Sequence, residues 1–531
     1  MLKRLLILPV LSVFLSAATT EQLIDNFLHK FDEYIQKTMP DWAIPGIAVV
    51  IVTPSKVLLC KGYGTREVGK NKPVNEHTIF QIASLTKNFT ASIAGILESK
   101  QIFSLQDLVK KYLPEFNLAN KEVTEKATLQ DLISHRMGMD QFAGDTLMKI
   151  GLAPKQIVEK FGMIPFNKRF RDDYTYSNQM FGFMGLVMEN ATHKKFSELF
   201  DEYISKPLGM NRSTAGDSLI DTEKSLWNKF KALFGKDENI ALCHDKTPEG
   251  HAVCIGLPKL VYVFPATSGV NTTAHDLGIW LQCQLNDGRH ENQQIVPKAH
   301  IQAMRQAVVY HNTIKPTDMQ FPPEVMKNVG YGMGWFSYDY GKEGNTLQIF
   351  EHMGGYAGQR SLTFMCHSEG FAVAIISNLG NFNINLYPEV LRNVFLDCFL
   401  NLEECDWNTE YVKRKAVYYK KLNNQRSAKK LMKLLPKHDD KFYIGTYFNE
   451  LYGEIEITSG PNGLEFKANN NSCAIVHWNE DEFNLNGWEF NGNMSRSDPN
   501  FIEFGKNEKG QTIAYVSFLF EGIDTIFTRK N

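Results

Sequence analysis

Apolar residues near the start of the chain recur at helical spacing and are followed by runs typical of strands. A first amphipathic helix is predicted over 22–38 by Leu23, Ile24, Phe27, Phe31 and Ile35. The apolar runs 47–52 and 57–60 flank Thr-Pro-Ser-Lys, which predicts a β-hairpin. A further apolar stripe predicts a helix over 84–100.

The middle of the chain, from about 105 to 310, is mostly helical in pattern and is broken by Pro and Gly, which predicts a helical subdomain. Three apolar runs then predict an antiparallel meander: 346–353, 361–366 and 371–377. Gly354-Gly355 is taken as the first turn, and a helix near 387–400 follows. Because strands lie at both ends of this region, we expect an α/β fold: an antiparallel sheet flanked by helices, whose first and last strands share one sheet, with an inserted helical subdomain.

The pattern changes again after Trp407. Lys and Arg dominate as far as Lys437, which favours a solvated linker helix over an anion-binding or membrane-binding segment. Short alternating runs separated by Gly then predict a small all-β, barrel-like domain. The expected division is 1–18 signal peptide, 19–404 main domain, 405–437 basic linker and 438–531 β domain.

Two other segments could contact a membrane. Lys3 and Arg4 precede an apolar run over 5–15 and the small residues 16–18, which is the pattern of a secretory signal cleaved near Thr19. The alternative, a signal anchor, is disfavoured because a span needs about 20 apolar residues. The apolar positions of 222–236 predict a helix, which is either a lid or membrane-surface helix or, as we favour, a buried helix of the insertion. We therefore expect a secreted or lumenal protein without a stable membrane span.

Composition narrows the possible partners. The 531 residues are 43% hydrophobic with a formal net charge of −2, so a packed globular protein is expected and no basic field exists to bind nucleic acid. Eight cysteines occur without CxxC spacing or a neighbouring His cluster, so neither a metal nor another cofactor is expected. Export would permit disulfides, and the pairs closest in sequence are Cys243 with Cys254 and Cys398 with Cys405. Sequons, including one at Asn88, make a glycoprotein possible.

The strongest chemical signal is the pair Ser84 and Lys87 at the start of a predicted helix. Spacing of i, i+3 places both side chains on one helix face. A serine hydroxyl needs a base to act as a nucleophile, and a desolvated lysine can serve as that base. The motif alone is weak, because Ser427 and Lys430 repeat it in the basic stretch.

Two further elements change that assessment. Tyr176-Ser177-Asn178 precedes an apolar helical run, and a Tyr hydroxyl can relay a proton while an Asn amide binds substrate or braces Lys87. His352, Gly354 and Gly355 stand at the end of a predicted strand, where the glycines let a substrate backbone approach and a backbone N–H point at an oxyanion. A surface turn and a structural His are the alternatives for these two elements.

Taken in order, Ser84-x-x-Lys87, Tyr176-x-Asn178 and His352-x-Gly354 resemble the three motifs of the serine β-lactamase and penicillin-binding-protein superfamily. The similarity lies in the branch of class C β-lactamases, D-alanyl-D-alanine carboxypeptidases, D-aminopeptidases and esterases, and it covers roughly residues 22–400. Tyr443-x-Gly445-x-Tyr447 and Tyr452-Gly453 resemble the lipocalin-like domain that follows many such hydrolases.

The resemblance implies a role for each motif residue. Ser84 would be acylated, Lys87 and Tyr176 would transfer protons, Asn178 would position substrate, and the N–H groups of Ser84 and Gly355 would form an oxyanion hole. His352 is expected to be a further catalytic residue, and Gly354 and Gly355 to bind substrate together with Asn178. His352 stands where β-lactamases usually have Lys, which argues against a β-lactamase. A second departure is Arg136-Met137-Gly138, where the family has a small polar residue before the glycine.

The sequence therefore predicts a secreted serine hydrolase that forms an acyl-enzyme at Ser84 with peptide, amide or ester substrates. The alternative is an inactive binding or scaffold protein with the same fold, and a third possibility places the main function in the β domain. Substrate, stereochemical preference and oligomeric state stay open.

Overall fold

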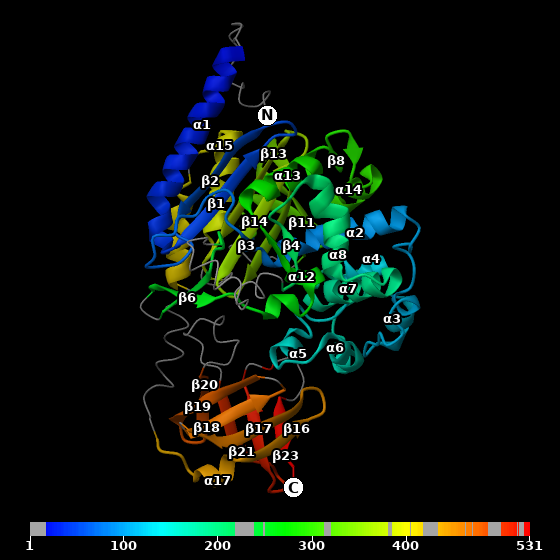
Figure 1. The fold of residues 1–531 in the computed structure, drawn as a ribbon, viewed down its shortest axis with the longest axis vertical. Helices are drawn as coiled ribbons and strands as arrows, with labels where there is room; N and C mark the ends of the chain where they lie inside the picture. The colour runs from blue at the N-terminus through cyan, green and yellow to red at the C-terminus, as the bar shows by residue number, and fades with distance from the viewer. Residues whose placement is uncertain are drawn as a thin grey trace.

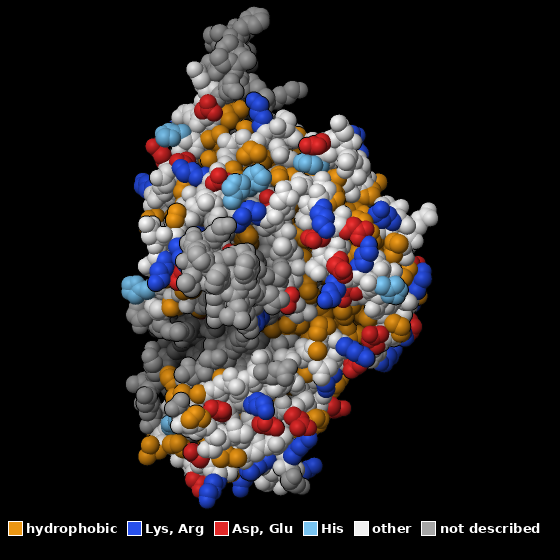
Figure 2. Space-filling model, viewed as in Figure 1, with side chains coloured by type: hydrophobic (Ala, Val, Ile, Leu, Met, Phe, Trp, Pro, Cys, Tyr) orange, Lys and Arg blue, Asp and Glu red, His pale blue; other side chains and the backbone are white. Residues whose placement is uncertain are grey.

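A computed structural model describes residues 17–530, apart from 218–237, 248–249, 313–319, 381–384, 404, 418–433, 462, 470, 487–500, 518 and 520–524. The chain forms a large α/β unit and a small β-barrel beneath it (Figure 1). On the face shown in Figure 2, Lys and Arg side chains are interspersed with Asp and Glu.

The large unit is built on an eight-stranded sheet in the order β10-β11-β12-β13-β14-β15-β1-β2, in which every neighbouring pair is antiparallel. The first strand, β1 (Gly46–Val52), pairs with the last, β15 (Phe371–Ser377), so the prediction that they share one sheet is confirmed. The others are β2 (Val57–Gly64), β10 (Val309–Tyr310), β11 (Met326–Tyr331), β12 (Phe336–Lys342), β13 (Asn345–Tyr356) and β14 (Gln359–Cys366).

Strand β1 shows why the sheet has helices on both faces. All seven of its residues are buried, and they alternate between two hydrophobic clusters. Ile47, Val49 and Ile51 share a cluster with residues of α1 (Ala17–Thr38) and α15 (Tyr387–Leu400). Ala48, Val50 and Val52 face the other way, toward α13 (Ala274–Leu285). Alternation on a strand directs successive side chains to opposite faces, so each face requires its own cover.

The meander differs from its prediction in one respect. Strand β13 continues through Gly354 and Gly355 to Tyr356, and the turn to β14 falls at 357–358. A Cβ on Gly354 would lie 2.2 Å from the Ile82 carbonyl oxygen and 2.2 Å from Ser361 Oγ. Glycine is therefore needed here because another backbone segment crosses the strand closely, and not because the chain reverses.

Helices between β2 and β10 form the second lobe beside the sheet, as Figure 1 shows. The main ones are α2 (Thr86–Ser99), α5 (Asp145–Lys149), α6 (Pro154–Lys160), α7 (Asn178–Thr192), α12 (Pro265–Ser268) and α14 (Lys298–Arg305). The region also contains short strands that the helical prediction missed, including the hairpin of β5 (Cys243–Lys246) and β6 (Ala252–Gly256). The predicted α/β fold with an inserted helical part is confirmed.

The C-terminal region is a closed eight-stranded barrel, as predicted. Its strands are β16 (Gly445–Asn449), β17 (Gly453–Gly460), β18 (Gly463–Ala468), β19 (Asn471–Asn479), β20 (Glu482–Asn486), β21 (Phe501–Lys506), β22 (Thr512–Val516) and β23 (Ile526–Arg529). Each of these strands pairs with a neighbour on both sides. The barrel lies against the helical lobe at α5 and α6 (Figure 1).

Several predictions fall on residues that the structure does not describe. The predicted helix 222–236 and most of the signal segment lie outside the described residues. Residues 407–417 are helical, whereas 418–433, the rest of the basic stretch, also lie outside them. Among the helices of the described part, none combines the length and apolarity that crossing a bilayer requires.

Candidate active site

Ser84 lies in a tight turn between a two-residue strand and α2. The turn is the 3-10 segment η2 (Ala83–Leu85), and Ala83 has a φ of 47°, in the left-handed region that non-glycine residues rarely adopt. From Phe80 to Leu97, Ser84 is the one residue that is not buried. The strained turn thus presents the Ser84 hydroxyl while burying its neighbours, and strain of this kind is concentrated at functional sites.

Lys87 is one turn further along, and its side chain is completely buried. Its Nζ donates hydrogen bonds to Ser84 Oγ at 2.8 Å, to Asn178 Oδ1 at 2.9 Å and to the Thr267 carbonyl oxygen at 3.3 Å. Burial lowers the pKa of Lys87 to about 7, against the opposing effect of the Asp145 charge. A substantial fraction of Lys87 is therefore neutral near pH 7 and can accept the Ser84 proton.

The amide of Asn178, the first residue of α7, links Lys87 to a carboxylate. Its Nδ2 donates to Asp145 Oδ2 at 2.7 Å, while the neighbouring Gln179 Nε2 donates to Asp145 Oδ1 at 3.3 Å. These bonds fix the orientation of the Asn178 amide, so its oxygen faces Lys87. Asp145 was missed by the sequence reasoning, because nothing in the sequence around it marks it as part of a site.

The ring of Tyr176 lies beside Lys87, with Lys87 Nζ 4.9 Å from the ring centroid. Burial raises the pKa of Tyr176 above its ordinary range, although a hydrogen bond with Ser84 opposes the shift. Its hydroxyl therefore keeps its proton at neutral pH. The ring of His135 packs against it, with centroids 4.1 Å apart.

His352 is buried in β13, and both of its ring nitrogens are engaged within the sheet. Nδ1 lies 2.8 Å from the Met353 carbonyl oxygen, which can only accept, so Nδ1 carries the hydrogen. Nε2 then accepts from the Tyr331 hydroxyl at 3.0 Å. Burial, assisted by the Lys87 charge, lowers the pKa of His352 to about 3, so the ring is neutral. These bonds favour a role in positioning β13 over a role in proton transfer.

The glycines of β13 lie against the Ser84 turn. A Cβ on Gly354 would lie only 3.2 Å from the Ser84 nitrogen. Ser361 Oγ, from the paired strand, donates to the Ile82 carbonyl oxygen at 2.8 Å and ties the sheet to the turn. Gly355 is partly exposed beside this junction. The predicted oxyanion donors, the N–H groups of Ser84 and Gly355, thus belong to adjoining segments.

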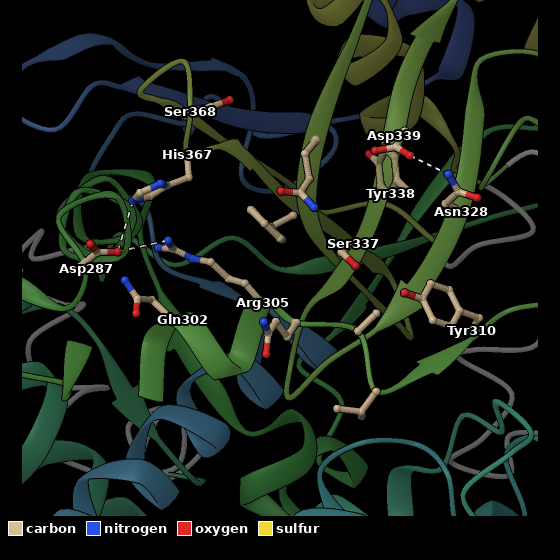
Figure 3. A pocket seen from close by; sticks show the side chains of 15 residues that line it. Asp287, Gln302, Arg305, Tyr310, Asn328, Ser337, Tyr338, Asp339, His367 and Ser368 are labelled. Atoms are coloured by element: carbon tan, nitrogen blue, oxygen red, sulfur yellow. Dashed lines mark hydrogen bonds and ion pairs between the residues drawn. The ribbon is translucent and has the colours of Figure 1, made fainter. Parts of the chain in front are cut away.

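A separate cavity of about 900 Å³ lies between α14 and the sheet (Figure 3). In this cavity Asp287 contacts Arg305 at 3.3 Å and His367 at 3.2 Å, while Asp339 accepts a hydrogen bond from Asn328 at 2.7 Å. Its lining includes none of the motif residues and brings together no serine and lysine. The three sequence motifs therefore lie apart from this cavity, around Ser84. Among the described residues there is also no group of three His, Cys, Asp or Glu side chains that could hold a metal ion.

Comparison with curated proteins gives distant relatives. Protein flp of Staphylococcus aureus is 22% identical over 375 residues, covering 70% of this chain and 67% of that protein. The unguisins hydrolase ungD' of Aspergillus campestris is 26% identical over 407 residues, covering 74% and 70%.

Solved structures show the same fold at low identity. The octameric penicillin-binding protein homologue from Pyrococcus abyssi has a TM-score of 0.57 at 19% identity and covers 92% of this chain and 98% of its own. The D-alanine carboxypeptidase AmpC from Burkholderia cenocepacia has a TM-score of 0.52 at 18% identity, covering 70% and 99%. EstCE1, a hydrolase with promiscuous acyltransferase activity, has a TM-score of 0.54 at 17% identity, covering 70% and 99%.

Residues 31–384, which include all three sequence motifs, match the family description Beta-lactamase. This match spans well over half of the sequence. The chain therefore belongs to the beta-lactamase family.

Proposed function

We propose that this protein is a serine hydrolase that forms an acyl-enzyme at Ser84 with peptide, amide or ester substrates. The observation that carries the proposal is the continuous set of contacts from Ser84 Oγ to Lys87 Nζ, on to Asn178 and then to Asp145. It supplies a nucleophile, a buried base and a fixed orientation for that base, which is the arrangement required of an activated serine.

Acylation begins when neutral Lys87 removes the Ser84 proton as Oγ attacks the substrate carbonyl carbon. The carbonyl oxygen becomes an oxyanion, which the N–H groups of Ser84 and Gly355 can stabilise in the tetrahedral intermediate. As the bond to the leaving nitrogen or oxygen breaks, Tyr176 donates its proton to that atom, and the proton held by Lys87 replaces it. Water then attacks the ester carbon while Lys87 accepts one of its protons; as the bond to Oγ breaks, that proton passes to Ser84 Oγ and the acyl group leaves as a carboxylic acid.

The relatives support a hydrolase without identifying the substrate. Their names describe an unguisins hydrolase, a D-alanine carboxypeptidase and a hydrolase with promiscuous acyltransferase activity, so we assign the reaction type and not a single acyl group. The neutral His352 in place of the usual Lys removes a fixed charge that would bind a substrate carboxylate. We therefore infer that esters and neutral amides are favoured over substrates recognised through a carboxylate.

We also propose that the protein acts in a secretory lumen or outside the cell. The support for this location is the sequence of residues 1–18, with its basic start, apolar run and small residues. Edman sequencing of the exported protein should find a mature N-terminus near Thr19, whereas retention of Met1 would contradict the proposal.

Covalent labelling tests the nucleophile. The purified full chain is treated with a fluorophosphonate and, separately, with a fluorescent penicillin, and the adduct is located by peptide mass mapping. We expect labelling at Ser84 that disappears in Ser84→Ala. Ser427→Ala, which removes the serine of the second Ser-x-x-Lys sequence, is the matched control and should label normally.

The result also separates the alternatives. Labelling by both probes favours a peptidase-like acyl pocket, whereas labelling by the fluorophosphonate alone favours an esterase. If folded protein reacts with neither probe, the acyl-enzyme proposal fails and the inactive binding protein becomes the better description.

A further inference from the structure

The barrel contacts the helix α5 at both ends. At its start, the Tyr452 hydroxyl lies 3.4 Å from Thr146 Oγ1. At its end, Asn469 Nδ2 donates to the carbonyl oxygen of Ile150, the C-cap residue, at 2.7 Å. Tyr452 comes from the β16–β17 turn and Asn469 from the β18–β19 turn. Two separate turns of the barrel therefore hold one short helix of the large α/β unit.

The contact is packed as well as hydrogen-bonded. Leu147 and Ile150 of α5 belong to the same hydrophobic cluster as Leu451 and Tyr452 of the barrel, and all four are fully or almost fully buried. Next to them, a Cβ on Gly151 would lie 3.1 Å from Asn471 Nδ2. Buried side chains in close packing transmit displacement, because interiors have few voids to absorb it. The position of α5 is thus coupled to that of the barrel.

Helix α5 begins with Asp145. The Asp145 carboxylate accepts hydrogen bonds from Asn178 and Gln179, and Asn178 in turn contacts Lys87. Thr146, which the barrel contacts, directly follows Asp145, whose carboxylate orients the Asn178 amide beside Lys87.

We propose that the C-terminal barrel is a positioning element of the active site: its β16–β17 and β18–β19 turns hold α5 so that Asp145 keeps Asn178 directed at Lys87. The inference rests on the proposed function at Ser84. It assigns Tyr452 and Asn469, more than 360 residues from the nucleophile in sequence, a role in acylation without contact to substrate.

The direction of the effect follows from the charges. If α5 moves away, the Asp145 carboxylate stabilises the Lys87 ammonium less, and Lys87 loses its proton at lower pH. The Asn178 amide also loses a partner that fixes its orientation. Weakening the barrel contact should therefore slow acylation. It should also move the acid limb, the rising part of the acylation rate plotted against pH, to lower pH.

The test uses the full chain carrying Tyr452→Phe and Asn469→Ala together. The rate of Ser84 labelling by a fluorophosphonate is measured across pH, beside Asp145→Asn and the combination of all three changes. We expect labelling at optimal pH to slow by about 3- to 10-fold, the range that loss of one hydrogen bond gives. We expect the acid limb to shift in the direction that Asp145→Asn shifts it, and the triple variant to behave like Asp145→Asn alone, since both act through one carboxylate.

The matched control makes the same two changes elsewhere in the barrel: Tyr515→Phe, whose ring packs on Phe501, and Asn507→Ala, whose side chain bonds Gln511. Circular dichroism confirms that each variant is folded, and Asn469→Ala alone replaces the double variant if that one does not fold. Three outcomes would each overturn the inference: a control that shifts the acid limb equally, an unchanged pH profile in the interface variant, or effects that add to those of Asp145→Asn. In each case labelling of the wild type would still support Ser84 as the nucleophile. Failure of the wild type itself to label would instead remove the proposed function, and the inference with it.

Discussion

Lys87 Nζ lies 2.8 Å from Ser84 Oγ, and its other hydrogen bonds go to two neutral carbonyl oxygens, those of Asn178 and Thr267. The nearest carboxylate in this network, Asp145, bonds the far end of the Asn178 amide. A directly bonded carboxylate would hold the ammonium in its charged form. Placing an amide between the two lets Lys87 stay close to half-protonated at neutral pH while it is still held in place.

The pH dependence of acylation should follow Lys87. Because only the neutral amine can accept the Ser84 proton, the labelling rate should rise with pH through the Lys87 pKa of about 7 and then level off. Asp145 raises this pKa, so Asp145→Asn should lower it and move the rise to lower pH. The measurement is the rate of fluorophosphonate labelling from about pH 5 to pH 9. Glu122→Gln, which removes an exposed carboxylate paired with Lys126, should leave the profile unchanged.

Lys87 should also lower the stability of the folded protein in a pH-dependent way. Its folded pKa of about 7 lies below the ordinary lysine pKa of 10.5, so the folded state binds fewer protons than the unfolded state between these values. The loss of folding stability caused by the buried Lys87 amine is therefore complete below about pH 7, and it disappears as pH rises through the unfolded pKa. Lys87→Met, which removes the buried amine, should abolish labelling and raise the melting temperature, relative to wild type, more at about pH 6 than at about pH 9.

A melting temperature that falls equally at both pH values would show that the buried amine is not the source of the effect. The exposed Lys110→Met, which removes a lysine paired with Glu125 at the surface, is the control. It should change the melting temperature little at either pH, because exposed ion pairs contribute about 0–1 kcal/mol.

His352 should act through the position of β13. With a pKa of about 3, it does not titrate where the acid limb of acylation lies. His352→Gln keeps one donor and one acceptor for Met353 and Tyr331, so we expect a reduced labelling rate with the midpoint of the acid limb unchanged. His352→Ala should lower both the rate and the thermal stability, because it leaves the buried Tyr331 hydroxyl without its acceptor at a cost of about 1–3 kcal/mol. A shifted midpoint in His352→Gln would instead show that His352 titrates in the reaction.

The part of the site that lies at the start of one helix could be predicted from the sequence. Ser84 and Lys87 are three residues apart, and helical geometry alone brings their side chains together. Thr267 reaches the Lys87 nitrogen, and Asp145 reaches the Asn178 amide beside it, from positions far along the chain, and only tertiary packing places them there. No local pattern could have revealed either residue.

The sheet was predicted where strands are apolar and missed where they are not. β1 and β15 are buried on both faces and read as continuous apolar runs, whereas β11 and β12 carry exposed Lys327 and Asn328 and small glycines among their apolar residues. The end of β13 was misplaced because a Gly-Gly pair usually marks a turn. Here it marks the place where the Ser84 turn crosses the strand.

That crossing yields the last prediction. In Gly354→Ala the new Cβ would lie 2.2 Å from the Ile82 carbonyl oxygen and 3.2 Å from the Ser84 nitrogen, so either β13 or the Ser84 turn must move. We expect a loss of about 1–3 kcal/mol of stability, the usual cost of overpacking, and a fall in labelling rate of about 100-fold if the turn is displaced by about 1 Å. Gly505→Ala is the matched control, because this strand glycine of the barrel has only Ile513 Cγ1, at 4.0 Å, near its Cβ position. The measurements are urea unfolding and the labelling rate of the two variants. Equal free energies of unfolding and equal labelling rates would contradict close packing of β13 against the Ser84 turn.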